Sequence, residues 1–264
     1  MHIYSDRRAY SEAVKAVAIV ILIVGIGGCR SRADDRIARA HELGRNPTEP
    51  NKNRVEKLME DDDRDVRATA LVVMGGMDPP RAKRMAAAAL SDRDGLVRAA
   101  AVSILSDAPA PEMIRTLVAL ATDDPVWQVR ARAVDAVAPL GREAVGEVFS
   151  RALSDPVRHV RRAALRACAE RSFSCPVDRL SALVVEDSDW ENRVEAARAL
   201  GASSDPNAYA GLDAAARDPN EFVRATAAGA RRALERAAIP RPPAPPPPAP
   251  PPTRPAGEKP KAGV

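Results

Sequence analysis

Aromatic residues and cysteines are scarce in this chain. Eight of the 264 residues are aromatic and three are cysteines. Sandwiches and barrels of β-strands are rich in aromatic and β-branched residues, while disulfide scaffolds and zinc-ribbon arrays need regularly spaced cysteines. The two shortages together argue against all of these classes.

Catalytic groups are scarce as well. The histidines are only His2, His41 and His159, and the sequence has no glycine-rich phosphate loop, paired-histidine helix or serine-hydrolase motif. His159 is expected on a helix surface among arginines. We therefore expect no enzymatic activity, no metal and no cofactor.

Alanine and arginine are abundant instead. The chain has 52 alanines and 34 arginines, a net charge of +4 and a pI near 9.2. Alanine has the highest helix propensity, and its small side chain lets helix backbones approach closely, so an all-α fold is indicated. A basic chain suggests a nucleic-acid or membrane-surface partner, but that inference depends on where the charge lies.

Residues 1–28 have the features of an export signal. Basic residues precede an uncharged, mostly aliphatic run that extends from Ala16 to Gly28. A transmembrane helix needs about 20 apolar residues, which is more than this run supplies, whereas secretory signals have a shorter apolar core. We therefore expect a signal peptide here.

The end of this run, Ile26-Gly27-Gly28-Cys29, resembles the lipobox of bacterial lipoproteins. The resemblance implies cleavage before Cys29, lipid attachment to it, and anchoring in a membrane of the bacterial cell envelope. Because Arg30 follows rather than an aspartate, it favours the outer membrane. A buried lipid chain contributes about 0.8 kcal/mol per CH₂ group. The alternatives are an ordinary cleaved signal with an incidental cysteine, or an uncleaved anchor.

Three residue types recur at nearly constant spacing along the middle of the chain, with a period of about 31 residues. An arginine, an aspartate six residues before it and an alanine three residues after it each occur six times, and valine precedes the arginine in five units. Asn192 breaks the valine column, and we expect it to weaken the core there. The aspartate and arginine columns comprise Asp61 and Arg67, Asp92 and Arg98, Asp124 and Arg130, Asp155 and Arg161, Asp187 and Arg193, and Asp218 and Arg224.

Each period is predicted to fold as two helices. In the third unit, apolar residues lie at helical spacing over 111–121, and again over 126–139. Asp123-Asp124-Pro125 separates the two segments, and Pro125 is expected at the start of the second helix. A unit of this size cannot bury its apolar face alone, so the units must stack.

Units three, four and six have the pattern Asp-Pro-x-x-x-Val-Arg-x-x-Ala at the turn of the helix pair. Helix pairs of about 31 residues with this turn resemble the HEAT-repeat family over roughly residues 50–238, and in particular its HEAT-like branch with phycobilin-lyase-type repeats. The resemblance implies an α-α superhelix of about six helix pairs. It also implies that the aspartates and arginines form a structural ladder, in which each arginine binds turn carbonyls or an aspartate of its own or the next unit. The implied function is a protein-interaction scaffold. A HEAT-like enzyme of the lyase type and a nucleic-acid-binding protein are the alternatives.

The segments that flank the repeat domain, 50–239, differ from it in composition. Residues 29–49 are polar, and we expect them to form either a tether or an N-terminal cap. Residues 240–264 contain 12 of the 24 prolines, which favours polyproline II and excludes a packed helix. We expect a disordered tail that acts as a spacer, contacts cell wall or lipid, or binds a proline-binding groove.

Cys168 and Cys175 are seven residues apart. In an oxidising compartment they can form a disulfide between the end of a helix and the loop that follows it. Two independent buried thiols are the alternative, because spacing does not determine geometry.

Second helices line the concave face of HEAT-like stacks, so we expect the positions two and five residues after each reference arginine to point outward there. In units three to five these positions are charged, except for Ala163, and in the other units they are small or apolar. Two tryptophans, three residues before the reference arginine, are of the type that anchors interfaces. The alternative is a solvated helix face with the tryptophans packed into turns. The candidate partner-binding residues are Trp127, Arg132, Asp135, Arg158, Arg162, Arg166, Trp190, Glu195 and Arg198.

The excess positive charge lies outside the repeats. Residues 1–28 have a net charge of +1 and residues 240–264 of +3, whereas residues 29–239 contain 33 basic and 33 acidic residues. An electrically neutral array with few lysines lacks the basic stripe that is typical of nucleic-acid binding. We therefore expect a protein partner and no nucleic acid.

Overall fold

The structure is a computed structural model. It describes residues 31–106, 110–140, 142–170, 175–203 and 205–238. The expected signal peptide, Cys29 and the proline-rich tail lie outside the described residues.

The described residues form helices joined by short turns, with no strand among them. No helix within these ranges is both long enough and apolar enough to cross a membrane. The α-helices are α2 (Arg32–Gly44), α3 (Glu49–Lys57), α4 (Arg64–Met77), α5 (Pro79–Ala89), α6 (Gly95–Leu105), α7 (Pro111–Asp123), α8 (Trp127–Val137), α9 (Arg142–Ala152), α10 (Arg158–Glu170), α11 (Val177–Glu186), α12 (Trp190–Ala202), α13 (Ala208–Ala215) and α14 (Glu221–Ala238), with short 3-10 helices at Leu58–Glu60 and Ala138–Leu140.

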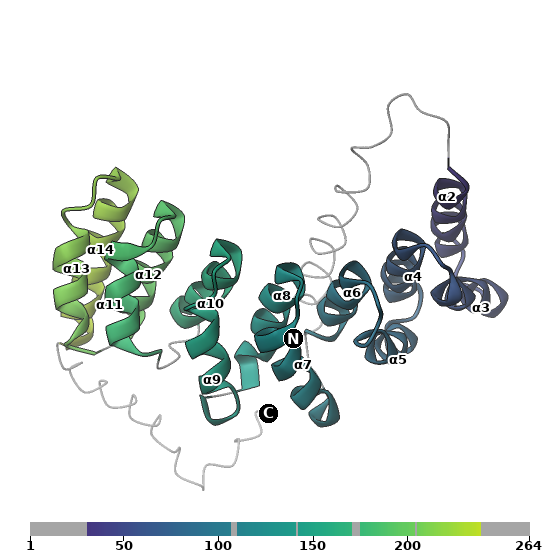
Figure 1. The fold of residues 1–264 in the computed structure, drawn as a ribbon, viewed down its shortest axis with the longest axis horizontal. Helices are drawn as coiled ribbons and strands as arrows, with labels where there is room; N and C mark the ends of the chain where they lie inside the picture. The colour runs from purple at the N-terminus through teal and green to yellow at the C-terminus, as the bar shows by residue number, and fades with distance from the viewer. Residues whose placement is uncertain (1–30, 107–109, 141, 171–174, 204, 239–264) are drawn as a thin grey trace, which may run out of the picture.

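Six helix pairs follow α2 along the chain, from α3–α4 to α13–α14. Each pair corresponds to one period of the sequence, and the pairs stack side by side into a curved array (Figure 1). The prediction of an all-α superhelix of about six helix pairs is confirmed.

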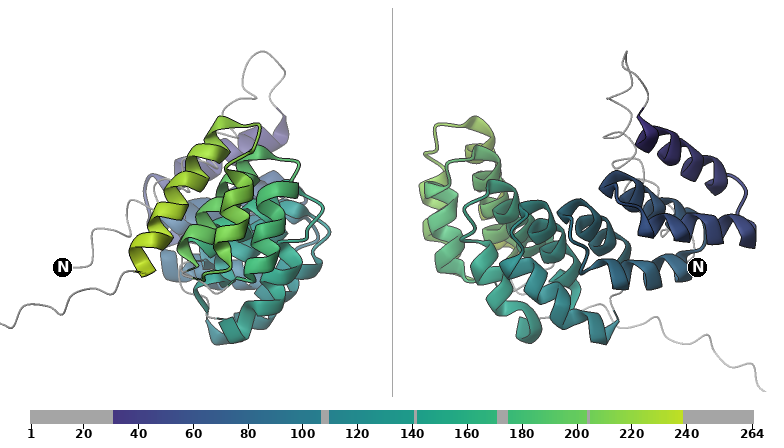
Figure 2. Two further views of the ribbon diagram at one scale, coloured as in Figure 1. Left: turned by 90° about the vertical axis from the view of Figure 1, so that its left-hand side faces the viewer. Right: turned by 45° about the vertical axis from the view of Figure 1, so that its right-hand side comes forward.

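The even-numbered helices form the inner, concave layer of this array, and the odd-numbered helices form the outer layer (Figures 1 and 2). Each even-numbered helix packs extensively on the next, from α2 to α14, whereas among the described odd-numbered helices only α11 and α13 approach that extent, and α7 and α9 contact each other much less. Neighbouring helices lie closer together on the inside of a curved array than on its outside. The layer whose successive helices are more closely packed is therefore the inner one.

Small side chains permit this close stacking of the inner layer. The alanine column of the repeats is buried, with at most 1% of each residue exposed. Gly201 in α12 faces Ala230 in α14, and a Cβ atom added at Gly201 would lie 2.7 Å from the Cβ atom of Ala230. The abundance of alanine in the composition therefore reflects helix-to-helix distance in the inner layer.

The N-terminal segment contains a packed helix. The Ser31 hydroxyl and the Asp34 carboxylate form a capping box that starts α2. Ala40 and Leu43 are buried, and α2 packs on α4. In the described part of the 29–49 segment, the chain thus covers the first helix pair as a cap would.

The second helix of the third unit begins later than expected. Asp124 accepts the N–H group of Val126 on its side chain at 2.8 Å, which closes a turn of the kind that aspartate favours. Pro125 is the middle residue of this turn, and α8 starts only at Trp127. The expectation that Pro125 would occupy the first helical position is therefore corrected.

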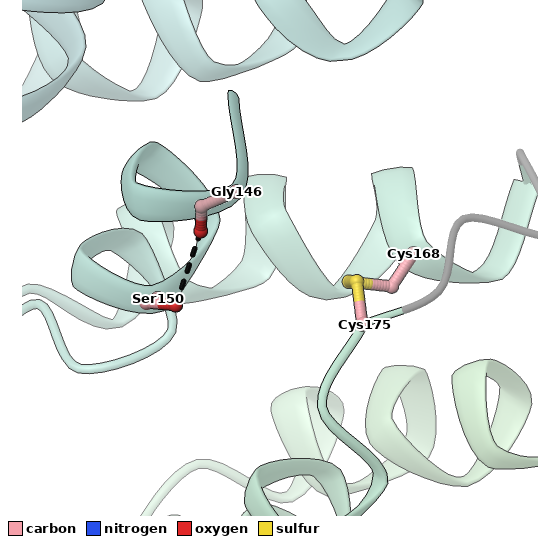
Figure 3. Close-up of a disulfide and its surroundings, with 4 residues drawn as sticks. All are labelled: Gly146, Ser150, Cys168 and Cys175. Atoms are coloured by element: carbon pink, nitrogen blue, oxygen red, sulfur yellow. Dashed lines mark hydrogen bonds between the residues drawn. A yellow bond between two sulfur atoms is a disulfide. The ribbon is translucent and has the colours of Figure 1, made fainter. Parts of the chain in front are cut away.

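Cys168 and Cys175 form a disulfide that joins α10 to the residue pair preceding α11 (Figure 3). Their Cα atoms are 5.9 Å apart, and both residues are buried. Figure 3 also shows α9 nearby, where the Ser150 hydroxyl donates to the Gly146 carbonyl at 3.0 Å. Of the two alternatives for this cysteine pair, the structure has the bridge rather than free thiols.

Candidate functional site

The repeated arginines and aspartates form a ladder along the turns that join the helices of each pair. In the fourth unit, Nη1 of Arg161 donates to the carbonyl oxygen of Asp155, six residues earlier, at 2.9 Å. Its Nε and Nη2 atoms bind the two carboxylate oxygens of Asp187 in the next unit at 2.7 and 2.8 Å. One guanidinium therefore holds its own turn and clamps the neighbouring one.

The same two-pronged clamp occurs at five successive unit boundaries, with nitrogen–oxygen distances between 2.6 and 3.1 Å. Paired hydrogen bonds between arginine and carboxylate are among the strongest in proteins. The pairs are Arg67–Asp92, Arg98–Asp124, Arg130–Asp155, Arg161–Asp187 and Arg193–Asp218.

Each ladder aspartate also organises its own turn. In all six units its Oδ1 atom accepts the N–H group two residues later, at 2.7 to 3.0 Å. Burial by itself would raise the pKa of Asp187, but hydrogen bonds from Arg161 and from the Asp189 N–H group outweigh it and lower that pKa. The hydrogen bond to Asp187 raises the pKa of Arg161. These columns are therefore structural.

The ladder extends one step further toward the N-terminus than the sequence pattern indicated. Arg36 of α2 binds Asp61 with nitrogen–oxygen distances of 2.7 and 3.1 Å. Arg36 lies one period before Arg67, so the repeat spacing could have revealed it. It was missed because the aspartate and alanine of the repeat pattern are absent around it, where Arg30 and Arg39 stand instead.

Two of the candidate partner-binding arginines are engaged inside the array. Arg158 binds Asp189 of the next unit at 2.9 Å, and Arg162 binds Asp189 at 3.0 Å and Glu191 at 2.5 Å. Both lie where the fourth and fifth units meet. Their charges stabilise that junction, and Arg158 remains largely exposed there.

Asn192 completes this junction rather than weakening it. It is fully buried, its Oδ1 accepts from Nε of Arg162 at 3.0 Å, and its Nδ2 donates to the Arg158 carbonyl and the Asp187 carboxylate at 3.1 and 3.2 Å. A buried amide costs stability only when its groups lack partners. The expectation that Asn192 weakens the fifth unit is corrected.

The two tryptophans stack on aromatic rings of the following unit. Trp127 lies on His159 with ring centroids 4.8 Å apart, and Trp190 lies on Phe222 at 5.6 Å. Trp190 is 41% exposed and Phe222 is 58% exposed. Both pairs follow the ladder edge of the array, where the second helices begin.

The remaining candidates form a row of charged side chains, here called the concave stripe, across α8, α10 and α12. Arg166 binds Asp135 of the preceding unit at 2.9 and 3.0 Å, and Arg198 binds Glu195 within α12 at 2.9 Å. Burial raises the pKa of Asp135 while Arg166 opposes that rise, and the charge of Asp135 is the main cause of the raised pKa of Arg166. The stripe comprises Arg132, Asp135, Arg166, Glu195 and Arg198.

The inner layer is less uniformly open than the repeat pattern predicted. Thr69 and Ala163 occupy the position two residues after the reference arginine, yet both are buried. Thr69 lies in α4, on which α2 packs. The expectation that this position points outward is therefore wrong for these two units.

A shallow groove continues the stripe between α12 and α14. It begins beside Arg198 and is otherwise lined mostly by small residues. The residues lining it are Arg198, Gly201, Ala202, Thr226, Gly229, Ala230 and Ala233.

Among the described residues, no group of three or more histidine, cysteine or acidic side chains is arranged to hold a metal ion. His159 is half-buried against Trp127. Cys29, the expected lipid-bearing residue, lies outside the described part of the chain.

A family model described as HEAT repeats matches residues 52–138 and 142–232. No curated protein matches the sequence.

Solved structures of low sequence identity share the fold. YibA of Escherichia coli is 21% identical, with 71% of each chain covered and a TM-score of 0.55. An engineered protein is 19% identical over 85% of this chain and 71% of its own, with a TM-score of 0.53. The CpcE–CpcF phycocyanin lyase of Nostoc sp. PCC7120 is 21% identical over 81% of this chain and 91% of its own, but its TM-score is 0.42. These likenesses show the fold alone.

Proposed function

Because the chain belongs to the HEAT-repeat family, we propose that it is a lipid-anchored scaffold of the bacterial cell envelope that binds a partner protein through its concave stripe. The proposal assigns it no catalytic activity, cofactor or nucleic-acid partner. The membrane is reached through the lipid on Cys29, with the outer membrane favoured. The proline-rich tail serves as a spacer or as a contact with cell wall, lipid or a proline-binding groove.

The observation that carries this proposal is the charged row on three adjacent inner helices. Arg132, Arg166 and Arg198 are exposed, and each comes from a different helix pair. A curved layer presents such side chains to one partner at the same time, and complementary charge across an interface contributes specificity and speed of association. Small residues in the adjoining groove let a partner approach the backbone closely.

Reversing the charge of the stripe should abolish partner binding. In a chain with Arg132, Arg166 and Arg198 all changed to Glu, we expect partner affinity to fall about 100-fold or more, because like charges then face each other across the interface. The measurement is quantitative cross-linking and affinity capture of the tagged full chain from its own membranes.

The matched control reverses three arginines on the outer layer. Arg54, Arg84 and Arg115 are exposed and lie on α3, α5 and α7. Changing them to Glu alters the net charge by the same amount and should leave capture unchanged. Unchanged capture by the stripe variant, with the fold intact by circular dichroism, would reject the stripe as the binding site.

Export and lipid anchoring rest on two independent features. The first is the lipobox-like segment that ends in Cys29. The second is the Cys168–Cys175 disulfide, because disulfides persist in oxidising compartments such as the periplasm and are rare in the cytosol. Both support a position outside the cytosol.

Removing the lipidation cysteine should release the chain from the membrane. In the Cys29→Ala variant we expect no incorporation of labelled fatty acid, because a lipid chain can be attached only to that thiol. Fractionation and lipid labelling in the native cell measure the effect. The double variant Cys168→Ala, Cys175→Ala is the control and should remain labelled. Labelled Cys29→Ala protein would contradict the anchor.

A further inference from the structure

Arg224, the last arginine of the ladder, is anchored like the others, but no carboxylate among the described residues is clamped by it. Its Nη1 atom donates to the carbonyl oxygens of Asp218 and Pro219 at 2.7 and 2.8 Å. The equivalent atom of Arg161 makes the same two bonds within its own unit, to Asp155 at 2.9 Å and to Pro156 at 3.1 Å. Both guanidinium groups are therefore held in the same orientation by their own turns.

The other edge of the Arg224 guanidinium faces the open end of the array. In Arg161 that edge binds Asp187 of the next unit. Among the described residues, no acceptor bonds to Nε or Nη2 of Arg224, and the residue is exposed. Five internal clamps of the same chain show what a guanidinium held in this way binds, namely a carboxylate in a turn between two helices.

The chain has no carboxylate in register to fill this position. Each clamped aspartate follows its arginine by 25 or 26 residues, which for Arg224 leads to Ala249 and Pro250. The one acidic residue beyond position 239 is Glu258, and lysine follows it directly. A basic segment of this kind is poorly matched to an arginine site.

Apolar surface surrounds the unfilled clamp. Ala225 and Ala228 on α14 are exposed, whereas Val194 and Ala197, one period earlier on α12, are buried. Phe222 is 58% exposed at the same end. The first turns of α14 therefore leave exposed the apolar positions that the next helix pair covers in α12, whereas further along Arg231 stands where α12 has the buried Leu200.

The opposite end of the array is closed differently. There α2 supplies Arg36 to the first ladder aspartate and exposes several charged side chains, among them Arg32, Asp35 and Arg39. Solenoids normally end in a cap with such a polar outer face. The α14 end also exposes charged side chains, among them Arg231, Arg232 and Glu235, so what sets it apart from the α2 end is the open edge of Arg224.

From these contacts we infer that the α14 end binds an acidic helical hairpin of a partner protein, whose turn carboxylate is clamped by Arg224. This inference rests on the proposed scaffold function and specifies a second contact. Arg232 lies one period after Gly201, at the equivalent place in its repeat unit. It adds positive charge about 12 Å along the helix from Arg224. A partner there must therefore be acidic.

A second copy of the chain is a poorer occupant. Its ladder aspartates are already clamped by arginines of the preceding units, including Asp61 by Arg36. A copy would have to open one of its own clamps to supply a turn carboxylate. A partner with an unclamped turn carboxylate has no such cost.

The test uses the full chain and a synthetic peptide of residues 177–202. This peptide contains α11, α12 and the Asp187 turn, and it carries six acidic and three basic residues. We expect it to bind the wild-type chain and to shift the Nε–H resonance of Arg224 in nuclear magnetic resonance spectra. Arg224→Met, Arg224→Lys and the Asp187→Asn peptide should each weaken binding about tenfold, because each loses the paired charged hydrogen bonds.

Controls separate this site from the concave stripe. Arg236→Met removes an exposed arginine farther along α14 and should leave binding unchanged, as should the triple charge reversal of the stripe. Loss of peptide binding in the stripe variant would overturn the α14 site while supporting the scaffold function. No binding of the peptide, once circular dichroism shows it to be helical, or equal binding by Arg224→Met, would overturn the site alone.

Self-association is tested in the same preparation. Analytical ultracentrifugation of the unliganded full chain should show no dimer that depends on Arg224. A dimer that Arg224→Met abolishes would overturn the choice of a partner protein and assign the surface to a second copy.

Discussion

Replacing Arg161 with methionine should lower the free energy of unfolding by about 3 kcal/mol or more. The side chain of its partner, Asp187, is completely buried, and that of Arg161 is 13% exposed. Without the guanidinium, Asp187 keeps its charge in a site that excludes water, with only Asn192 and its own turn as hydrogen-bond partners. Removing one member of a buried ion pair is far more damaging than losing a surface pair.

The matched control for this change is Arg224→Met. Within the described part of the chain, Arg224 makes only the two bonds to its own turn carbonyls, so we expect a loss of about 1 kcal/mol or less. Chemical denaturation of both variants measures the difference. Because repeat arrays are stabilised by contacts between neighbouring units, Arg161→Met should also separate the unfolding of the N-terminal and C-terminal halves. Equal losses for the two variants would contradict a stabilising role for the clamp between units.

The effect of Arg161→Met should shrink in acid. The pKa of Asp187 is lowered in the folded chain, and so are the pKa values of Asp92 and Asp218. Stability from a lowered carboxylate pKa is fully present above the unfolded value of about 3.9, and it is lost as the pH falls through the folded value. Below about pH 4, wild type and variant should therefore converge in stability.

Reduction of the Cys168–Cys175 disulfide should cost about 2.5 kcal/mol of stability. The two cysteines are seven residues apart, and a small closed ring limits the unfolded chain less than a large one does, which keeps the expected value below that of long-range bridges. Amide hydrogen exchange should become faster in α10 and α11, because the disulfide joins the last turns of α10 to the residues just before α11. Denaturation with and without reductant measures the total.

The double variant Cys168→Ala, Cys175→Ala separates the bridge from the reductant. It should be as unstable as the reduced wild type, and reductant should not affect it further. A wild-type chain whose stability is unchanged by reductant, with reduction verified by mass spectrometry, would contradict the prediction.

The repeat pattern predicted most of the fold correctly. Turn formation by aspartate and proline, helix periodicity and alanine at close contacts are all local properties, and they return in each repeat unit. The start of α8 was misplaced because the sequence alone did not distinguish a proline at the first helical position from one within an aspartate turn. Arg36 was missed because α2 retains a single column of the repeat.

The candidate site was predicted as one patch, and the structure divides it in two. Arg158 and Arg162 lie at a unit junction, and the concave stripe retains Arg132, Arg166 and Arg198. Column positions alone did not reveal this division. The acceptors of Arg158 and Arg162 lie 27 to 31 residues further along the chain, so their proximity depends on how the units stack.

Sequence by itself determined the period, the helix pairs, the ladder residues within the six repeats and the neutrality of the repeat domain, because each follows from recurring residues, local patterns or composition. Only the tertiary structure decided that each ladder arginine clamps the aspartate of the next unit, that Asn192 completes a junction, and that Arg224 is left with an open edge. Those outcomes depend on the rise and curvature between successive helix pairs. Stacking sets that geometry, and a single unit does not contain it.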